Sequence, residues 1–255
     1  MLLAHALGRD RVWLVAHSGD GIEESKRSMA DALFSRRRAG EPVAYLLGER
    51  EFWGLALRVS PAVLIPRPET ERLVELALER LPAAGDARVL DLGTGSGAIA
   101  IAIATERPRA RVTAIDASAA ALEIARANVA RHGDRVHLLQ SDWFDALGDA
   151  RFDLIVSNPP YIGRSDPHLG EGDLRFEPGS ALSAGPTGME AIEAIASAAP
   201  RYLDHGGSLL IEHGWDQRDA CLELFARLGY AEVADHADLA GVPRVIAGRR
   251  SPGAG

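Results

Sequence analysis

From Arg88 onward, short apolar segments alternate with longer amphipathic segments, and this alternation limits the possible folds more than any other feature of the chain. The apolar segments are typical of buried strands and the amphipathic segments of helices. Strands are predicted at residues 89–91, 112–116, 136–139, 154–156, 208–212, 231–234 and 244–247, and helices at 98–106, 119–131, 189–203 and 217–228. The pattern predicts an α/β fold, a parallel sheet with helices on both faces. Right-handed crossovers place the carboxyl ends of all its strands on one rim.

The residues before this alternation have a different pattern, which predicts a small domain and a connector. Residues 1–47 have apolar positions at helical spacing and predict a helical domain, and residues 48–66 contain short strand-like pieces and predict a hairpin connector. The main domain is expected over 67–250 and opens with an amphipathic helix over 70–81.

Two later segments fall outside the alternation. The stretch 159–188 is too long for a plain connector, which indicates a functional loop. The tail after Arg250 is expected to be frayed.

Charge and cysteine content exclude several classes of protein. The net charge is -8, whereas a protein that holds nucleic acid mainly by its phosphates usually carries the opposite sign. The single cysteine, Cys221, permits no internal disulfide and fits a reducing compartment, so we expect a cytoplasmic protein. No basic leader and no apolar stretch of membrane-spanning length is present. The eight histidines lack metal-ligand spacing, so no metal is expected.

A glycine-rich loop follows the first predicted strand of the main domain. It runs Asp91-Leu92-Gly93-Thr94-Gly95-Ser96-Gly97 and opens a helix. Glycines there permit a tight turn and let a ligand lie against bare backbone. Asp116 ends the next strand, where a carboxylate can accept both ribose hydroxyls of an adenosine. The loop and the acid predict a nucleoside-containing cofactor.

The loop alone does not exclude NAD, because Gly93, Gly95 and Ala98 satisfy the loose dinucleotide pattern. Two features favour S-adenosylmethionine. Asp91 can hold the ammonium of a methionine moiety, directly or through water, and is less suited to a pyrophosphate. Asp142 and Trp143 follow the third strand, where a carboxylate can accept the adenine amino group and an indole can cover the adenine face.

The fourth strand ends in Asn158-Pro159-Pro160-Tyr161, the most specific signal in the chain. Two prolines fix φ and remove two backbone donors, so the turn is rigid. It exposes the Asn158 side chain and the Pro159 carbonyl, which can both accept hydrogen bonds from one planar NH2 group. The Tyr161 ring can pack against the group that carries that nitrogen.

This tetrapeptide on this framework resembles the S-adenosylmethionine-dependent methyltransferases that modify planar NH2 groups. Further motifs narrow the resemblance to the PrmC (HemK) family of peptide chain release factor glutamine N(5)-methyltransferases. They are Gly40-Glu41-Pro42, Glu51-Phe52-Trp53-Gly54, Leu64-Ile65-Pro66-Arg67-Pro68-Glu69-Thr70-Glu71, Arg175-Phe176-Glu177-Pro178 and Glu212-His213-Gly214-Trp215. The resemblance covers residues 2–249.

The resemblance implies a Rossmann-like class I methyltransferase sheet and a specific substrate, the glutamine of the Gly-Gly-Gln motif in class I release factors. S-adenosylmethionine would lie on Gly93–Gly97, Asp116 and Trp143, with Asn158 nearby. Asn158, Pro159, Pro160 and Tyr161 would hold the glutamine. Arg67 would help close the site, although an ion pair with Glu71 explains it equally well. The helical domain would dock the release factor, and it is expected to be truncated by a helix or two.

Four other functions remain open at this point. A nucleic-acid amino-methyltransferase would share the proline turn, and a glutamine methyltransferase acting on a ribosomal protein differs only in flanking motifs. A NAD-dependent dehydrogenase leaves the proline turn unexplained. A non-catalytic binding protein predicts loss of Asn158 or Asp116, and both are present. We expect a monomer with no membrane or nucleic-acid partner.

Overall fold

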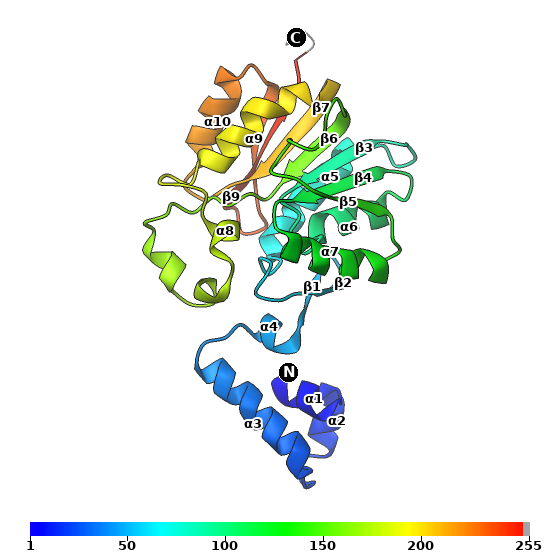
Figure 1. Ribbon diagram of the computed structural model, residues 1–255, viewed down its shortest axis with the longest axis vertical. Coiled ribbons are helices and arrows are strands. Elements are labelled where there is room, and N and C mark those ends of the chain that lie inside the picture. Colours follow the sequence, from blue (N-terminus) through cyan, green and yellow to red (C-terminus); the bar gives the residue numbers. More distant parts are fainter. Residues whose placement is uncertain (252–255) are drawn as a thin grey trace.

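A seven-stranded sheet organises the main domain of the computed structural model, which describes residues 1–251; the expected fraying of 252–255 lies outside them. The strand order is β5-β4-β3-β6-β7-β9-β8 (Figure 1). The strands are β3 (Arg88–Leu92), β4 (Arg111–Asp116), β5 (Val136–Gln140), β6 (Phe152–Ser157), β7 (Leu203–Glu212), β8 (Ala231–Ala237) and β9 (Pro243–Arg249).

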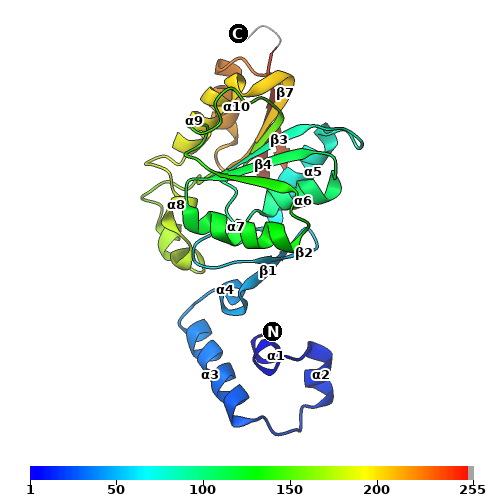
Figure 2. The same cartoon turned by 45° about the vertical axis from the view of Figure 1, so that its right-hand side comes forward.

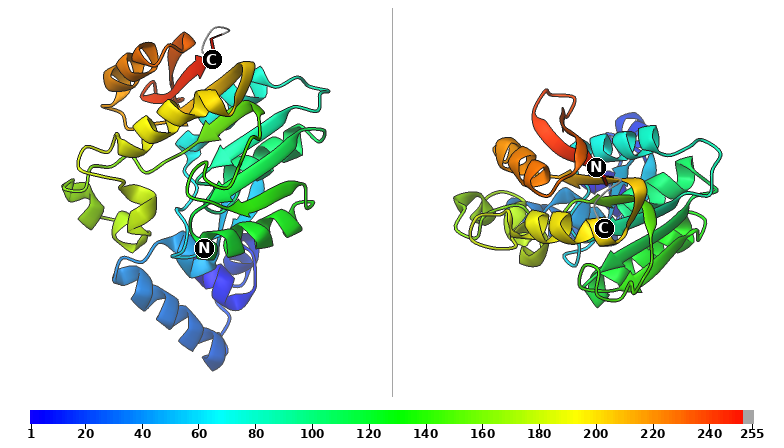
Figure 3. Two further views of the ribbon diagram at one scale, coloured as in Figure 1. Left: turned by 45° about the horizontal axis from the view of Figure 1, so that its top comes forward. Right: turned by 90° about the horizontal axis from the view of Figure 1, so that it is seen from above.

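Helices cover both faces of this sheet, which confirms the predicted α/β class (Figure 3). The helices on one face are α5 (Glu71–Arg80), α6 (Ala98–Glu106) and α7 (Ala119–Arg131), and those on the other are α9 (Glu190–Ala198) and α10 (Arg218–Arg227). Neighbouring strand residues face opposite layers: Val89 packs with α5 and α6, and Leu90 with the layer of α9. This period of two explains the continuous apolar runs of the central strands.

The sheet is mixed, which corrects the expectation of a purely parallel one. Strand β9 runs antiparallel to both neighbours, β7 and β8, while β3 to β7 pair in parallel. No helix separates β8 from β9, and only residues 238–242 connect them, so the chain returns in the opposite direction. A parallel crossover needs a much longer connection.

The helix predicted over 189–203 is shorter in the structure. Helix α9 ends at Ala198, and a 3-10 turn over Ala199–Arg201 follows it. Pro200 lacks the N–H that a continuing helix needs. Leu203 instead begins β7 and pairs with Phe152, so this strand is longer than predicted.

The amino-terminal residues form a separate group of helices below the main domain (Figure 2). They are α1 (Leu2–Leu7), α2 (Arg11–Ala16), α3 (Glu24–Arg38) and α4 (Val43–Leu47). Helices α1, α3 and α4 bury a small apolar cluster around Ala6, Leu33 and Leu46, to which α2 adds no buried residue. The chain then forms an antiparallel hairpin of β1 (Glu49–Phe52) and β2 (Leu55–Arg58). A 3-10 turn over Pro68–Thr70 leads into α5.

The segment between β6 and α9 is not an open loop. It contains 3-10 turns at Pro167–Gly170 and Leu174–Phe176 and the short helix α8 (Gly179–Leu182). A bridge between Gly163 and Gly185 closes it on itself. The segment lies at the carboxyl rim of the sheet because it starts where β6 ends. That rim also receives the ends of β3, β4, β5 and β7.

Candidate active site

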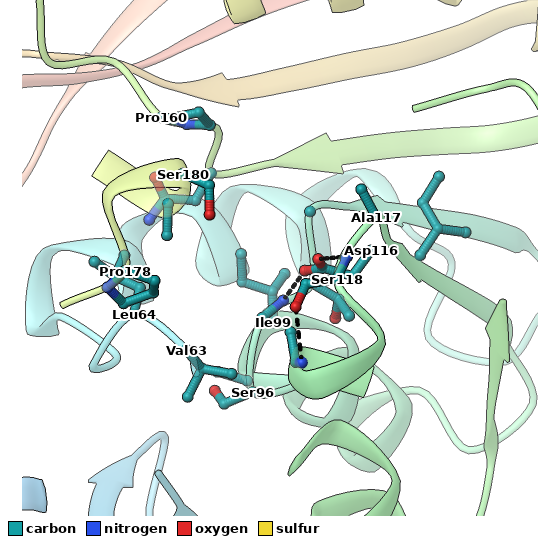
Figure 4. A pocket seen from close by; sticks show the side chains of 18 of the residues that line it. Val63, Leu64, Ser96, Ile99, Asp116, Ala117, Ser118, Pro160, Pro178 and Ser180 are labelled. Atoms are coloured by element: carbon teal, nitrogen blue, oxygen red, sulfur yellow. Dashed lines mark hydrogen bonds between the residues drawn. The ribbon is translucent and has the colours of Figure 1, made fainter. Parts of the chain in front are cut away.

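A cavity of about 420 Å³ opens at this rim, next to β3 and β6, where the strand order reverses. Such a switch point is where open α/β sheets bind ligands. Figure 4 shows Val63, Leu64 and Pro178 on one side of the cavity and Asp116 and Ala117 on the other. The sites predicted from sequence that line it are Arg67, Gly93, Thr94, Gly95, Ser96, Asp116, Asp142, Trp143, Asn158 and Pro160.

Four predicted residues do not line the cavity: Asp91, Gly97, Pro159 and Tyr161. Gly97 adopts φ +84, and a Cβ there would lie 3.1 Å from the Ile101 side chain. This glycine therefore serves the close turn into α6. Gly95 also has positive φ, but nothing lies within 4 Å of its Cβ position, so bare backbone is what it presents to the cavity.

The glycine loop is fastened to β4 by backbone and side-chain hydrogen bonds. Thr94 N–H donates to the Ile115 carbonyl (2.8 Å). Asp116 Oδ2 accepts from Gly95 N–H (2.9 Å), and its Oδ1 accepts from Ser118 N–H (2.9 Å). A carboxylate has about four acceptor positions, so Asp116 keeps capacity for donors in the cavity.

Asp91 is fully buried beneath the loop. Its Oδ2 accepts from the Thr94 hydroxyl (2.6 Å), and its Oδ1 has no hydrogen-bond partner. Burial raises the pKa of Asp91 to about 7, against the opposing effect of the Thr94 hydrogen bond. A buried carboxylate with an unsatisfied oxygen favours a cationic or hydrogen-bond-donating ligand group nearby.

Trp143 and Asp142 follow β5 on the same rim. The Trp143 ring stands 3.7 Å from the position that a Cβ on Gly93 would take, so the indole lies against the glycine loop. Trp143 has φ +41, an uncommon conformation for a bulky residue and one often found at functional sites. Asp142 is exposed beside it, at the open side of the cavity.

The diproline corner presents the Asn158 side chain to the cavity with its two ends in different surroundings. Asn158 Nδ2 donates to Thr70 Oγ1 (3.1 Å), whereas the buried Oδ1 has no hydrogen-bond partner. Behind the corner, the Tyr161 hydroxyl donates to Glu212 Oε1 (3.3 Å). Burial raises the pKa of Tyr161, so its hydroxyl stays protonated.

Arg67 lines the cavity, and its partner corrects the expected pairing with Glu71. Arg67 forms an ion pair with Glu177, whose side chain is fully buried, and Glu177 also accepts from Ile65 N–H (3.2 Å). Glu71 accepts from Trp53 N–H instead (2.9 Å). Burial raises the pKa of Glu177 despite Arg67. The pair joins the segment before α5 to the segment after β6.

Two supporting residues were not identified as functional from sequence. Thr70 belongs to the motif over 64–71, but nothing in that motif indicates that Thr70 would be buried beside Asn158. Asn128 is fully buried on α7; its Nδ2 donates to the carbonyls of Ser96 (2.8 Å) and Arg58 (3.0 Å), and its Oδ1 accepts from Arg58 N–H (2.7 Å). A single polar residue in an apolar helix face was the available signal for Asn128.

His213 lies outside the cavity and has acceptors at both ring nitrogens. Nε2 lies 2.7 Å from Asp235 Oδ2 and Nδ1 lies 2.8 Å from the Gly214 carbonyl, and the ring is fully buried. Within residues 1–251, no group of three or more histidine, cysteine or acidic side chains is placed to hold a metal ion.

The residues present fit S-adenosylmethionine. The bare Gly95 backbone can approach a ligand closely, and Asp116 offers acceptor capacity to hydroxyl groups. The unsatisfied Asp91 carboxylate oxygen under the loop suits an ammonium, and apolar walls around Val63, Ile99 and Trp143 suit a nucleoside. Asn158 lines the same cavity, and its unpartnered Oδ1 is an acceptor that a second ligand carrying an NH2 group could use.

In comparisons with known proteins, this chain matches two family models and is similar to several curated proteins. The methyltransferase small domain matches residues 71–169, and the PrmC N-terminal domain matches residues 1–48. A release factor glutamine methyltransferase of Bordetella pertussis is 52% identical over 97% of this chain and 92% of its own length. One from Xylella fastidiosa is 53% identical over 97% of this chain and 90% of its own length.

A solved structure shares the fold at low identity. It is a 16S rRNA N2 G1207 methyltransferase of Thermus thermophilus in complex with AdoMet and guanosine, with a TM-score of 0.60 and 21% identity. The match covers 79% of this chain and 49% of that chain. Among residues 1–251 no helix combines the length and apolar character needed to cross a membrane.

Proposed function

The chain belongs to the family of release factor glutamine methyltransferases, and from that premise we propose that it methylates the side-chain amide nitrogen of the Gly-Gly-Gln glutamine in class I release factors. The methyl donor is S-adenosylmethionine. The observation that supports the glutamine most directly is the unpartnered Asn158 Oδ1, held at a rigid corner of the cavity beside the glycine loop.

The glycine loop, Asp116, Asp142 and Trp143 hold the cofactor in this proposal. Asp116 accepts from the ribose hydroxyls, because its carboxylate keeps acceptor positions after binding Gly95 and Ser118. Trp143 covers the adenine face and Asp142 accepts from the adenine amino group. Asp91 faces the ammonium of the methionine part, which returns its buried carboxyl to the charged form.

When bound, S-adenosylmethionine supplies an electrophilic methyl group on a positively charged sulfur. An amide nitrogen is a poor nucleophile, because its lone pair is delocalised into the carbonyl. Asn158 Oδ1 and the Pro159 carbonyl would each accept a hydrogen bond from one N–H of the amide and so orient its nitrogen toward the cofactor. Both contacts strengthen as positive charge develops on nitrogen, so they favour the transition state over the ground state. Pro160 and Tyr161 pack against the glutamine side chain.

The proposal also covers the roles of the three parts of the chain, the cellular compartment and the oligomeric state. Residues 1–47 dock the release factor, residues 48–66 connect, and residues 67–250 carry the chemistry. The enzyme acts as a monomer in the cytoplasm, where its substrate is made and used. The acidic net charge fits a protein substrate better than a nucleic acid.

Incubation with labelled S-adenosylmethionine and three separate acceptors tests the proposal. We expect label in a Gly-Gly-Gln release factor and none in a ribosomal large-subunit protein or in nucleic acid. A release factor carrying Asn in place of that glutamine is the matched control, because its nitrogen is one methylene short of the methyl carbon. Label in the ribosomal protein or nucleic acid alone would contradict the proposed substrate.

A further inference from the structure

The cavity has a single basic side chain on its lining. The amino-acid part of S-adenosylmethionine carries an ammonium and a carboxylate on the same carbon. Asp91 under the glycine loop suits the ammonium, but Asp91 and Asp116 both disfavour a carboxylate nearby. A carboxylate that leaves water needs a cationic or hydrogen-bonding partner. Among the residues that the structure describes, Arg67 is the only arginine, lysine or histidine that lines the cavity.

The backbone of Arg67 is fixed on both sides. Arg67 stands between Pro66 and Pro68 and is extended, with φ −96 and ψ 143. The ring of a following proline restricts a residue to such a conformation. The Arg67 carbonyl accepts from Thr70 N–H (3.1 Å), within the 3-10 turn that leads into α5. The backbone from which the Arg67 side chain starts is therefore set before any ligand binds.

Glu177 anchors one edge of the Arg67 guanidinium. Arg67 Nη2 donates to Glu177 Oε1, and Glu177 Oε2 accepts from Ile65 N–H (3.2 Å). A guanidinium has five N–H groups in a rigid fork, and within residues 1–251 this is the one hydrogen bond that the Arg67 side chain makes. The Glu177 side chain is fully buried, whereas that of Arg67 is 29% exposed. The arginine is thus accessible and already oriented, so its ordering costs little when a ligand binds.

The strand order places Arg67 at the end of the cavity that a bound nucleoside leaves open. Thr70, one turn after Arg67, accepts from Asn158 Nδ2 (3.1 Å), and Asn158 follows β6. Asp116 ends β4 and Trp143 follows β5, on the other side of β3 in the order β5-β4-β3-β6. A nucleoside over β4 and β5 leaves the side of β3 and β6 for the methionine part. Arg67 lies on that side.

We propose that Arg67 binds the carboxylate of the methionine part of S-adenosylmethionine. The inference rests on the proposed function, in which Asp91 meets the ammonium of that part. Glu177 takes one edge of the guanidinium, and the remaining N–H groups form the fork that suits a carboxylate. Arg67 and Asp91 together recognise a complete amino-acid end. Adenosine derivatives that lack the carboxylate bind more weakly for this reason.

The N-terminus of α6 is the rival partner for the carboxylate. Helix α6 begins at Ala98, directly after the glycine loop, and a helix N-terminus favours anions. If α6 held the carboxylate, loss of the Arg67 side chain would not distinguish ligands with a carboxylate from ligands without one. The two arrangements therefore predict different binding data.

Two ligands and one substitution test the inference by binding alone. The ligands are S-adenosylmethionine and its decarboxylated form, which keeps the sulfonium and the amine but has no carboxylate. For Arg67→Gln, we expect the Kd of S-adenosylmethionine, measured by isothermal titration, to rise roughly tenfold to a hundredfold, the scale of a hydrogen bond to a charged group. The Kd of the decarboxylated form should change by less than about twofold, because that ligand offers Arg67 nothing to bind.

Two further variants guard against an effect on folding. Arg67→Gln leaves the buried Glu177 without its partner, so the double variant Arg67→Gln, Glu177→Gln removes both charges together. It should show the same loss of preference for the ligand with the carboxylate. Arg131→Gln is the matched control, because Arg131 is 46% exposed on α7, pairs with Glu49 (3.5 Å) and does not line the cavity. Both Kd values should be unchanged in this control.

Equal weakening of both ligands in Arg67→Gln and in the double variant would overturn the inference, because it would assign Arg67 a structural role alone. Unchanged Kd values for both ligands would overturn it as well and would leave the carboxylate to α6. These measurements do not use the release factor. A wild-type chain that binds S-adenosylmethionine but methylates no release factor contradicts the proposed substrate alone, so the two failures are distinguishable.

Discussion

The proposed role of Asn158 requires two things of one residue: a rigid backbone and a side-chain oxygen that is free to accept a hydrogen bond. The prolines at 159 and 160 fix the chain after it, and Thr70 occupies its donor group. The sequence predicts the first demand directly, because the effect of proline on φ is local. It does not predict Thr70, since the two residues are 88 positions apart and only the fold brings them together.

Replacing Asn158 by alanine should separate binding from chemistry. We expect the cofactor Kd to change by less than about tenfold, or ~1.4 kcal/mol, because the glycine loop and Asp116 remain. Turnover should fall by several orders of magnitude, since one of two acceptors for the substrate NH2 group is gone. Isothermal titration for the cofactor and single-turnover methylation measure the two effects. Full activity of Asn158→Ala would contradict the role given to the amide.

Asp91 should make the ligand-free protein less stable as the pH rises. Its folded pKa of about 7 lies above the ordinary aspartate value, so the unfolded chain loses its proton first. The free energy of unfolding should therefore decrease from about pH 4, the ordinary aspartate pKa, to about pH 7, by up to ~1.4 kcal/mol per pH unit for this one group, and level off above the folded pKa. Urea denaturation at a series of pH values measures the slope. Asp91→Asn should reduce that slope, while Glu212, whose pKa burial also raises to about 7, keeps part of it. The variant should also weaken cofactor binding; an unchanged slope would rule out Asp91 as a source.

Among the elements, Asn128 fastens the hairpin to the glycine loop. It bonds to Arg58 of β2 and to the Ser96 carbonyl from a position on α7. The hairpin and helix α7 were predictable from residue patterns, but this connection was not, because a lone buried polar residue does not reveal its partners. The direction of β9 was likewise hidden, since an apolar run is the same read in either direction.

Removal of the Asn128 amide should loosen both elements at once. Asn128→Ala leaves the Ser96 carbonyl without its side-chain donor, so the free energy of unfolding should fall by about 2–3 kcal/mol. Asn128→Asp keeps the acceptor for Arg58 N–H but loses the donors, and it should weaken cofactor binding in the same direction as alanine. Chemical denaturation and cofactor titration of both variants check this. Wild-type cofactor affinity in both would show that the loop does not need this support.

At the scale of the whole molecule, one buried thiol can report the opening of the main domain. Cys221 is the only cysteine, is fully buried against the sheet on α10, and has a pKa raised by burial to about 12. It should react with a thiol reagent only when this part of the core opens, so labelling should be slower by orders of magnitude than in concentrated urea. The labelling rate at increasing urea gives the stability of the core. Rapid labelling in native buffer would contradict the packing of α10 on the sheet.

The segment after the diproline corner contacts both the amino-terminal helices and the cavity wall within a few residues. Asp173 pairs with Arg37 of α3 (3.3 Å), and Arg175 Nη2 donates to the Ala39 carbonyl (2.8 Å). Glu177 binds Arg67, and Pro178 forms part of the cavity wall. Residues 173–178 thus connect the carboxyl end of α3 with the cavity wall, and a displacement of α3 would be expected to shift that wall. In the proposed docking role of residues 1–47, binding of a large partner would therefore be expected to alter the shape of the cavity.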